Sequence, residues 1–337
     1  MSPTVLLTGP AGVVGTALVE RLDAGGLICL THQSDVEGTA ARTVRGDVSR
    51  PRLGLTLADY DELAREVDVV VHSAAVTRFD ASREETFAVN VEGTRNMLGF
   101  VEDSGARLLQ LSTAFVTIGE VAQSGWVGAK HYLDSKRAAE ALVEDSGLDF
   151  YVIRPSVIVG DSHTGEVARL QGFHFFMRAL LKDDLPILPV EDGDLVDFVP
   201  ADLVADVVAA MVDEPPPTRS SWITAGERAW SAAKSIDEAR AAAAKRDHPV
   251  PRPRLVAPEM VDRLIRPVFF PELPKRIVRR YDQVTSIATV VVTPHPFESS
   301  LDELSLHYGR DFELDLDRTF RSSIGYLIDT LGRPVEA

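Results

Sequence analysis

Apolar runs and helical patterns alternate along the first half of the chain. Short runs rich in Val, Ile and Leu, bounded by polar or small residues, predict buried strands over 5–8, 27–30, 69–72, 107–112 and 150–153. Apolar residues spaced three and four apart predict the intervening helices, over 13–23, 57–67, 84–102 and 132–145. This alternation predicts an α/β fold of the Rossmann type, a doubly wound parallel sheet with helices on both faces.

The second half of the chain is less regular. Its pattern predicts a helix over 201–212, which ends before prolines 215–217 because their rings cannot continue it. A strand is expected over 222–224 and an alanine-rich helix over 232–246. Prolines interrupt 249–275, for which we expect irregular structure.

Composition narrows the class of protein. The 337 residues are 45% hydrophobic, which is ample for a buried core. The single cysteine, Cys29, excludes an internal disulfide framework, and the scattered histidines lack zinc spacing, so we expect no metal. A formal net charge of −16 argues against a nucleic-acid partner. No transmembrane or signal segment is predicted, which favours the cytoplasm, and the oligomeric state stays open.

A glycine motif joins the first predicted strand to the first predicted helix. Gly9 permits a tight turn, Gly12 lets the backbone approach a pyrophosphate, and Gly15 lets the helix pack closely on the sheet. The free N–H groups at the start of that helix would face the phosphates. The motif predicts a dinucleotide site that includes Thr8, Gly9, Gly12, Val13, Val14 and Gly15.

Three further residues predict proton-transfer chemistry near that site. Tyr132 and Lys136 are four residues apart, on one face of a predicted helix, where the cation would lower the pKa of the phenol. Lys136 would also hold the cofactor ribose. Thr113 follows a predicted strand, at an edge where ligands bind, and its hydroxyl would hydrogen-bond a reacting carbonyl oxygen.

The order of motifs resembles the extended short-chain dehydrogenases/reductases. Within them the chain is most similar to the branch of male-sterility proteins, fatty acyl-CoA reductases and thioester reductases. The resemblance covers about residues 4–212, and its motifs are TGPAGVVG, GDVSRPRLGL, VVVHSAAVTRFD, NVEGTRNML, LSTAFV, YLDSK, VIRPSVIVG and VDFVPADLV.

The resemblance implies a role for each matching position. Thr113 would orient the carbonyl, with Ser112 as the alternative; Tyr132 would donate the proton and Lys136 would assist it. Asn90 would brace the sheet near the site, or else only make a polar contact on its helix. Cofactor contacts are implied at the adenine for Asp47 and Val48, along the cofactor for Ser73, Ala74 and Ala75, and beside the nicotinamide for Pro155, Ser156 and Val157.

The turn after the second strand favours NADP(H) over NAD(H). NAD-specific sites place an acidic side chain there, to bind the ribose 2′-hydroxyl. Here the turn contains His32, and the first acid is Asp35. Arg42 and Arg45 follow and would meet a 2′-phosphate.

These assignments predict two regions. The NAD(P)-binding Rossmann domain is expected over 1–160, and it would also receive 196–212 and about 221–225. The segments 161–195 and 226–337 are expected to form a smaller, mostly helical substrate-binding region.

A basic segment interrupts this acidic chain. Residues 245–280 contain ten Lys and Arg against four Asp and Glu, a local charge of +6. Such a patch would dock an acidic acyl carrier protein or the phosphates of coenzyme A. Its interleaved Leu and Phe residues also permit binding to a membrane surface, and a solvated helix face paired with acids remains a third interpretation.

Two enzymatic functions remain open. The motifs favour NADPH-dependent reduction of an acyl thioester, bound to CoA or to a carrier, or of its aldehyde. The alternative is an NAD(P)-dependent alcohol/ketone dehydrogenase or epimerase for a polyketide, steroid or sugar-like substrate. Only eighteen residues separate Thr113 from Tyr132, which favours this alternative. An apolar stretch over 173–177 predicts either an apolar wall of the substrate site, which argues against a sugar nucleotide, or a helix that faces the core. An intact Thr/Tyr/Lys set disfavours a non-enzymatic NADP(H)-binding regulator.

Overall fold

Seven parallel strands form the central sheet of the protein. The computed structural model describes residues 2–36, 38–119, 127–182 and 185–332. The strands are β1 (Val5–Thr8), β2 (Leu27–Thr31), β3 (Arg42–Arg45), β4 (Val69–His72), β5 (Arg107–Leu111), β6 (Phe150–Pro155) and β11 (Ser220–Ile223). Their order is β11-β6-β5-β4-β1-β2-β3. Strands β2 and β3 are added on one side of β1 and the later strands on its other side, beginning with β4. This confirms the predicted doubly wound fold and places its switch point after β1.

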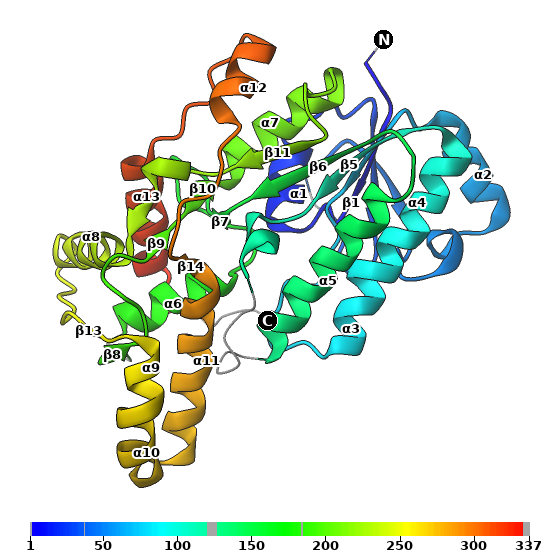
Figure 1. Cartoon of the computed structure of the whole chain (residues 1–337). Helices are drawn as coiled ribbons and strands as arrows, with labels where there is room; N and C mark the ends of the chain where they lie inside the picture. The colour runs from blue at the N-terminus through cyan, green and yellow to red at the C-terminus, as the bar shows by residue number, and fades with distance from the viewer. Residues whose placement is uncertain (1, 37, 120–126, 183–184, 333–337) are drawn as a thin grey trace.

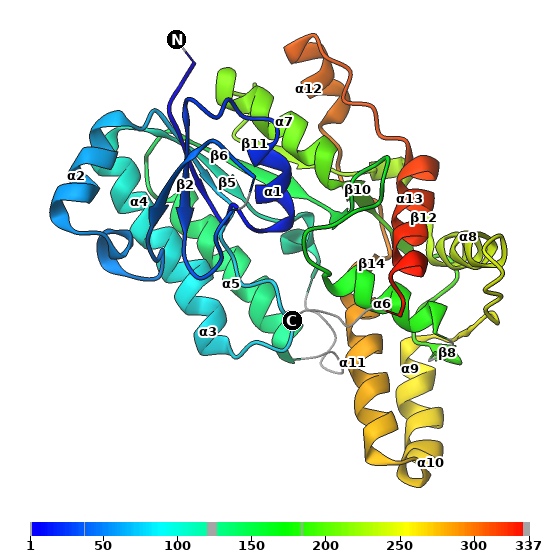
Figure 2. The ribbon, with the colours of Figure 1, turned by 180° about the vertical axis from the view of Figure 1, so that it is seen from behind.

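Helices cover both faces of the sheet (Figures 1 and 2). One face carries α1 (Val13–Val19) and α7 (Ala201–Asp213). The other carries α2 (Leu57–Glu66), α4 (Gly93–Ser104) and α5 (Val127–Glu144), with α3 (Arg83–Phe87) against α5. Strand β1 shows why both faces need cover, because Val5 and Leu7 enter one core and Leu6 the other.

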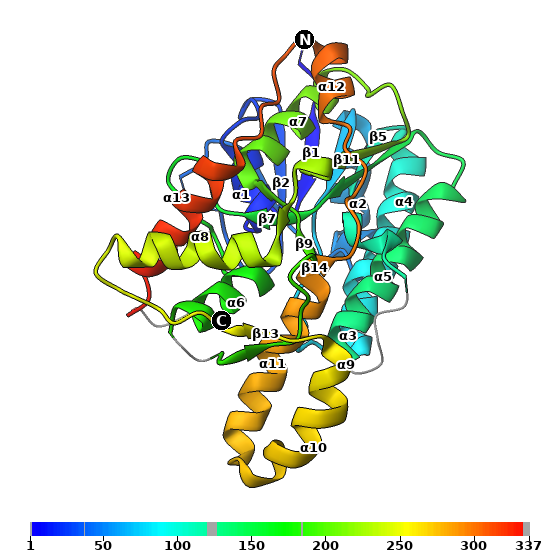
Figure 3. The same cartoon turned by 60° about the vertical axis from the view of Figure 1, so that its left-hand side comes forward.

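A second, smaller region packs against the carboxyl side of this sheet (Figure 3). Its helices α6 (Gly172–Leu181), α8 (Ala232–Ala244) and α13 (Leu316–Asp329) contact one another. Aromatic rings at Phe173, Phe198, Trp230 and Phe320 fill the space between them. This packing continues the core of the sheet without a break.

Short strands link the two regions. Strand β7 (Val157–Val159) pairs in parallel with β10 (Phe198–Pro200), and β8 (Ile187–Leu188) with β13 (Arg254–Leu255). Antiparallel pairs join β9 (Leu195–Val196) to β12 (Trp230–Ser231) and to β14 (Val292–Thr293). Helix α12 (Leu301–Tyr308) lies near the outer end of α7 (Figure 1).

A helical arm formed by residues 258–291 projects from the smaller region (Figures 1 and 3). One side contains α9 (Pro258–Met260), a wider turn over Val261–Ile265 and α10 (Arg266–Phe269); the other is α11 (Lys275–Val291). Arg266 bonds Asp282 across the arm at 2.7 Å. The expectation of irregular structure over 249–275 holds for 249–257, apart from β13, and is wrong from Pro258 onward. Pro258 and Pro267 lie in first helical turns, where proline is tolerated.

Other element boundaries also differ from the sequence-based expectations. The first helix ends at Val19 rather than at residue 23. The predicted helix over 84–102 is α3 and α4 joined through one wide turn, Ala88–Glu92. Strand β3 was not expected, because its polar residues form an exposed edge with no apolar signal. No helix in the described part of the chain is long and apolar enough to cross a bilayer.

Two glycine-to-alanine substitutions should have opposite effects on stability. A Cβ on Gly15 would lie 2.1 Å from the Gly9 carbonyl oxygen, so Gly15→Ala should cost about 3 kcal/mol or more. A Cβ on Gly99, within α4, would meet nothing within 4 Å, so Gly99→Ala should stabilise the fold by about 0.5–1 kcal/mol. Urea unfolding measures both, and equal effects would contradict this account of the glycine loop.

Candidate active site

The glycine loop after β1 lies against the loop after β4. Gly9 has φ +67°, and a Cβ there would be 2.8 Å from the Ala74 nitrogen. Gly12 begins α1 without a side-chain cap and donates its N–H to the Gly9 oxygen at 3.0 Å. Val13 and Val14 occupy the first turn of α1 and line the adjacent cavity. These contacts bring the backbone of the glycine loop close to the β4 loop, at the position where the sequence motif predicts a cofactor pyrophosphate.

The Thr8 hydroxyl holds the two loops together. It accepts hydrogen bonds from the N–H groups of Ser73, at 3.1 Å, and Ala74, at 3.0 Å. It lies 2.8 Å from Nδ1 of His72. Burial, with a further contribution from Lys136, lowers the pKa of His72 to about 3, so the ring is neutral and accepts from Thr8 at Nδ1. Ala75 continues this loop along the expected path of the cofactor.

Thr113, Tyr132 and Lys136 line one cavity of about 150 Å³ at the carboxyl edge of the sheet. Thr113 follows β5, and the other two project from α5. The cavity floor comes from segments after β5 and β6 and includes Ser112, Pro155, Ser156 and Val157. Residues 120–126, in the short connection between Thr113 and Tyr132, lie outside the described residues.

Tyr132 is a protonated phenol in this geometry. Burial raises its pKa to about 12, and a hydrogen bond with Thr113 opposes that rise. The expectation that Lys136 brings this pKa toward neutrality is not met, because the ammonium donates instead to the Leu111 carbonyl oxygen at 3.0 Å. A phenol that keeps its proton is suited to donate it to a substrate oxygen.

Lys136 is buried beside an ion pair. Burial lowers its pKa to about 8, and the nearby Glu140 carboxylate opposes the shift. Glu140 also accepts from Arg154 at 2.6 Å, so it is only partly available to Lys136. The ammonium is therefore retained below about pH 8 and lost above it.

Ser112 and Thr113 both line the cavity. Thr113 contacts Tyr132, which puts the two groups together around one oxygen position. The Ser112 hydroxyl is buried and has no hydrogen-bond partner among the described residues. This geometry favours Thr113 and leaves Ser112 available for a ligand.

Asn90 joins the β4 loop to α5. Its amide oxygen accepts from the Val76 N–H at 2.8 Å, and its amide nitrogen donates to the Val76 oxygen and to the Ser135 hydroxyl. Ser135 directly precedes Lys136, so Asn90 fixes the helix turn that carries the lysine. Asn90 therefore connects the loop after β4 to α5, and it contacts no strand of the sheet through these bonds.

The expected adenine pocket lies after β2 and β3. Burial opposes ionisation of Asp47, but hydrogen bonds from Ser49 and the nearby charges of His32 and Arg50 hold its pKa below the ordinary value. The Val48 oxygen accepts from Asn96 at 2.9 Å, which fixes the backbone of this turn.

The two arginines of β3 lie at opposite ends of that strand. Arg45 pairs in register with Thr31, at the carboxyl edge where His32 follows. Arg42 pairs with Ile28 at the other end and bonds Glu66 at 2.5 Å. Arg42 therefore lies at the end of β3 away from the cofactor edge. Only Arg45 of the two lies where it would meet a 2′-phosphate.

Several cavity residues had not been singled out from the sequence as site residues. Phe79 stacks at a tilt on Tyr132, with ring centroids 5.7 Å apart, and Gln171 and Gly172 begin the next wall. Phe79 lies in a motif that carried the family resemblance, which was the available signal. Val291, from the end of α11, had no signal, because only the fold brings it to this cavity.

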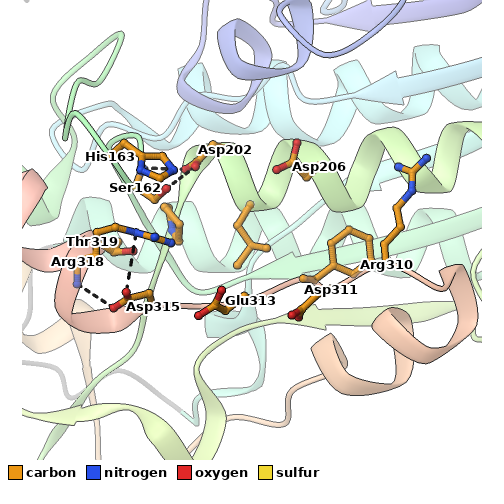
Figure 4. Close-up of a pocket in the computed structure, with 13 residues that line it drawn as sticks. Ser162, His163, Asp202, Asp206, Arg310, Asp311, Glu313, Asp315, Arg318 and Thr319 are labelled. Carbon is orange, nitrogen blue, oxygen red and sulfur yellow. Dashed lines mark hydrogen bonds and ion pairs between the residues drawn. The ribbon is translucent and has the colours of Figure 1, made fainter.

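A larger cleft of about 340 Å³ lies between α7 and the segment before α13 (Figure 4). Asp202 and Asp206 of α7 face Arg310, Asp311 and Glu313 across it. It contains none of the three candidate catalytic residues. Within the described ranges, no group of His, Cys, Asp and Glu side chains is arranged to hold a metal ion.

The sheet order and glycine loop define a dinucleotide-binding fold. Comparison with known families places the chain in a family of NAD-binding domains. The matching family model is described as "Male sterility protein" and covers residues 30–208, more than half of the chain. The chain belongs to that family, which confirms the resemblance drawn from its motifs.

Its curated relatives include much longer proteins. A hybrid PKS-NRPS synthetase, pvhA, of Talaromyces variabilis is 34% identical over 175 residues, which is 47% of this chain and 4% of that protein. Glycine betaine reductase ATRR of Emericella nidulans is 28% identical over 257 residues, 63% of this chain and 20% of that protein. The chain thus spans only a small part of either relative.

Solved structures share the fold across almost the whole chain. The terminal R domain of the myxalamid PKS-NRPS pathway matches with a TM-score of 0.75 and 21% identity, covering 99% of this chain and 93% of that one. A reductase domain of a nonribosomal peptide synthetase from Mycobacterium tuberculosis matches with a TM-score of 0.67 and 20% identity, covering 98% and 92%. At this identity the likeness shows the fold.

The charge on Lys136 should be visible in a pH profile. If the ammonium holds the cofactor ribose, kcat/KM for the nicotinamide cofactor should be level below about pH 8 and fall above it, as the cation is lost. Lys136→Arg keeps a cation to much higher pH, so this fall should disappear from the residual activity. A variant profile that still falls near pH 8 would contradict the assignment.

Proposed function

We propose that the protein is an NADPH-dependent reductase that converts an acyl thioester, carried by CoA or by a carrier protein, to its aldehyde. The observation that carries this proposal is the convergence of Thr113, Tyr132 and Lys136 on a cavity whose walls are largely apolar. The names of the relatives support it, since they describe a hybrid PKS-NRPS synthetase, a glycine betaine reductase and the terminal R domain of a PKS-NRPS pathway.

The roles of the chain's own residues follow from their positions. Bound NADPH supplies the hydride. Thr113 hydrogen-bonds the substrate carbonyl oxygen, and Tyr132 donates a proton to it as charge develops. Lys136 binds the ribose and keeps a positive charge near the phenol. The resulting hemithioacetal breaks its C–S bond and gives aldehyde and thiol.

The second candidate function is oxidation or reduction of an alcohol or ketone at the same site. The aromatic side chains of Phe79, Phe115 and Phe173 line the cavity and favour an apolar substrate over a sugar nucleotide. The same three catalytic groups would act on a ketone, so only substrate turnover separates the two functions. Reduction of a free aldehyde fits either of them.

The first test compares NADPH consumption with acyl-CoA, the matched aldehyde and a ketone panel. Turnover of acyl-CoA is expected, and Tyr132→Phe should reduce kcat by about 10²–10⁴-fold because it removes the donated proton. The dissociation constant for NADPH should stay unchanged in this variant. Turnover of ketones alone would reject thioester reduction and support the dehydrogenase function.

We assign the preference for NADPH to the edge formed by β2 and β3. Its first acid, Asp35, lies 3.3 Å from Arg45 in an exposed ion pair, which is weak enough for Arg45 to exchange this partner for a 2′-phosphate. Arg45 is two-thirds exposed and lies level with the turn that contains His32. The Arg45 guanidinium supplies the positive charge for a 2′-phosphate.

Replacing each arginine of β3 separates their roles. Arg45→Ala should raise the KM for NADPH about tenfold, through loss of a charged hydrogen bond, and leave the KM for NADH unchanged. Arg42→Ala is the matched control and should change neither, since Arg42 lies at the other end of β3, away from the cofactor edge. Equal effects of both variants on NADPH would contradict the assignment.

The helical arm supplies the docking surface for an acyl carrier in this proposal. Arg246, Arg252 and Arg266 pair with acids. Four exposed cations form no ion pair within the described part of the chain, namely Arg263, Lys275, Arg276 and Arg279. They lie among exposed apolar side chains, namely Met260, Leu264, Val268, Phe269, Leu273 and Ile277. An acidic partner with an apolar patch would complement this surface.

Helix α11 connects this surface to the cavity. It begins at Lys275, near the tip of the arm, and Val291 at its other end lines the cavity. Its 17 residues span roughly 25 Å. A carrier bound near the tip would therefore deliver its thioester along α11 on a flexible prosthetic arm.

Charge reversal tests the docking surface. Arg276→Glu with Arg279→Glu should raise the KM for a carrier-bound thioester about tenfold or more, and leave the KM for the free aldehyde unchanged. Arg65→Glu with Arg95→Glu, on α2 and α4, is the control and should change neither. An unchanged KM for the carrier substrate in the arm variant would reject this surface as the dock.

A further inference from the structure

A second void lies behind the candidate active-site cavity. Its volume is about 20 Å³, and its walls come from α6, α8, α11 and the short strands beside them. We call it the rear chamber. Among its lining residues are Phe176, Met177, Ala288 and Val291, so it is almost wholly apolar. Apolar voids of this kind stay dry and accept apolar groups.

Val291 belongs to the walls of both spaces. It lines the active-site cavity and the rear chamber, and it is buried. The same face of α6 continues from one to the other, because Phe173 lines the cavity while Phe176 and Met177, three and four residues on, line the chamber. The Val291 side chain is therefore part of the partition between them.

A continuous wall leads from the catalytic phenol to this partition. Phe79 packs on Tyr132. A Cβ on Gly172 would lie 3.1 Å from the Phe79 ring and 3.2 Å from Cγ2 of Ile287, so the glycine lets these two side chains pack closely along the wall. Ile287 directly precedes Ala288, which lines the chamber.

We propose that Val291 sets the length of the acyl chain, and that the substrate is a straight apolar acyl group whose far end stops against this side chain. The inference rests on the proposed function. A linear chain fits a wall of apolar side chains that runs away from Tyr132, whereas a branched or polar group would not. Removing the partition would join the chamber to the cavity.

Shortening Val291 should shift the preference to longer chains. The measurement is kcat/KM for straight-chain acyl-CoAs from butanoyl to palmitoyl. Val291→Ala should move the maximum to chains longer by at least the two carbons removed, with about a tenfold change in the long-to-short ratio, because each buried methylene favours binding about fourfold. An unchanged maximum would overturn the proposal.

Two matched variants separate chamber volume from general disturbance. Val291→Ala combined with Ala288→Val refills the chamber and should restore the original maximum. Ser235→Ala removes one polar atom from the chamber wall and changes its volume little. The Ser235 hydroxyl has no hydrogen-bond partner among the described residues, so this variant should keep the wild-type maximum. A shift with Ser235→Ala as large as that with Val291→Ala would also overturn the proposal.

A binding measurement keeps this inference separate from the proposed reaction. Calorimetry with straight-chain alcohols, in the presence of the cofactor, should show the same shift to longer chains in Val291→Ala. If no thioester is reduced but this shift appears, the thioester function fails and the role of Val291 stands. If thioesters are reduced and neither profile moves, the reaction stands and the role of Val291 is rejected.

Discussion

The close contact between the loops after β1 and β4 is the constraint on which the site depends. Gly9 lies so near the Ala74 backbone that no side chain fits, and the Thr8 hydroxyl accepts two amide hydrogen bonds from the β4 loop. The sheet reverses its order at this point, so the contact fixes the crevice in which doubly wound folds bind nucleotides. The neutral His72 beneath Thr8 completes the arrangement without adding charge.

Burial then sets the chemistry of the groups beside the crevice. It keeps the Tyr132 phenol protonated and weakens the hold of Lys136 on its proton. Both effects have one cause, the loss of water around a charged form. The first keeps on Tyr132 the proton that reduction of a carbonyl needs, and the second confines the charge of Lys136 to below about pH 8. Asn90 and the Glu140–Arg154 pair fix α5 around these groups. Proton donor and cation are thus placed by the same helix.

The sequence predicted what local pattern determines. Continuous apolar strands, the glycine loop and the spacing of Tyr132 from Lys136 all follow from short-range rules, and the parallel sheet confirmed the fold they implied. Long-range features were not accessible in this way. The polar edge strand β3 carries no apolar signal. Arg42 was wrongly expected at the cofactor edge, because the direction of β3 decides which of its two arginines lies there. Val291 reaches the cavity only through the fold of the arm.

Transfer of deuterium from NADPH tests the central claim most directly. NADPH labelled at the nicotinamide C4 position would be incubated with an acyl thioester and the protein, and the released product analysed by mass spectrometry. The account predicts an aldehyde, or the alcohol formed from it, with deuterium on the former thioester carbon, and loss of this product in Tyr132→Phe. A consumed thioester whose product carries no deuterium, or a labelled product that forms equally well without the Tyr132 hydroxyl, would contradict it.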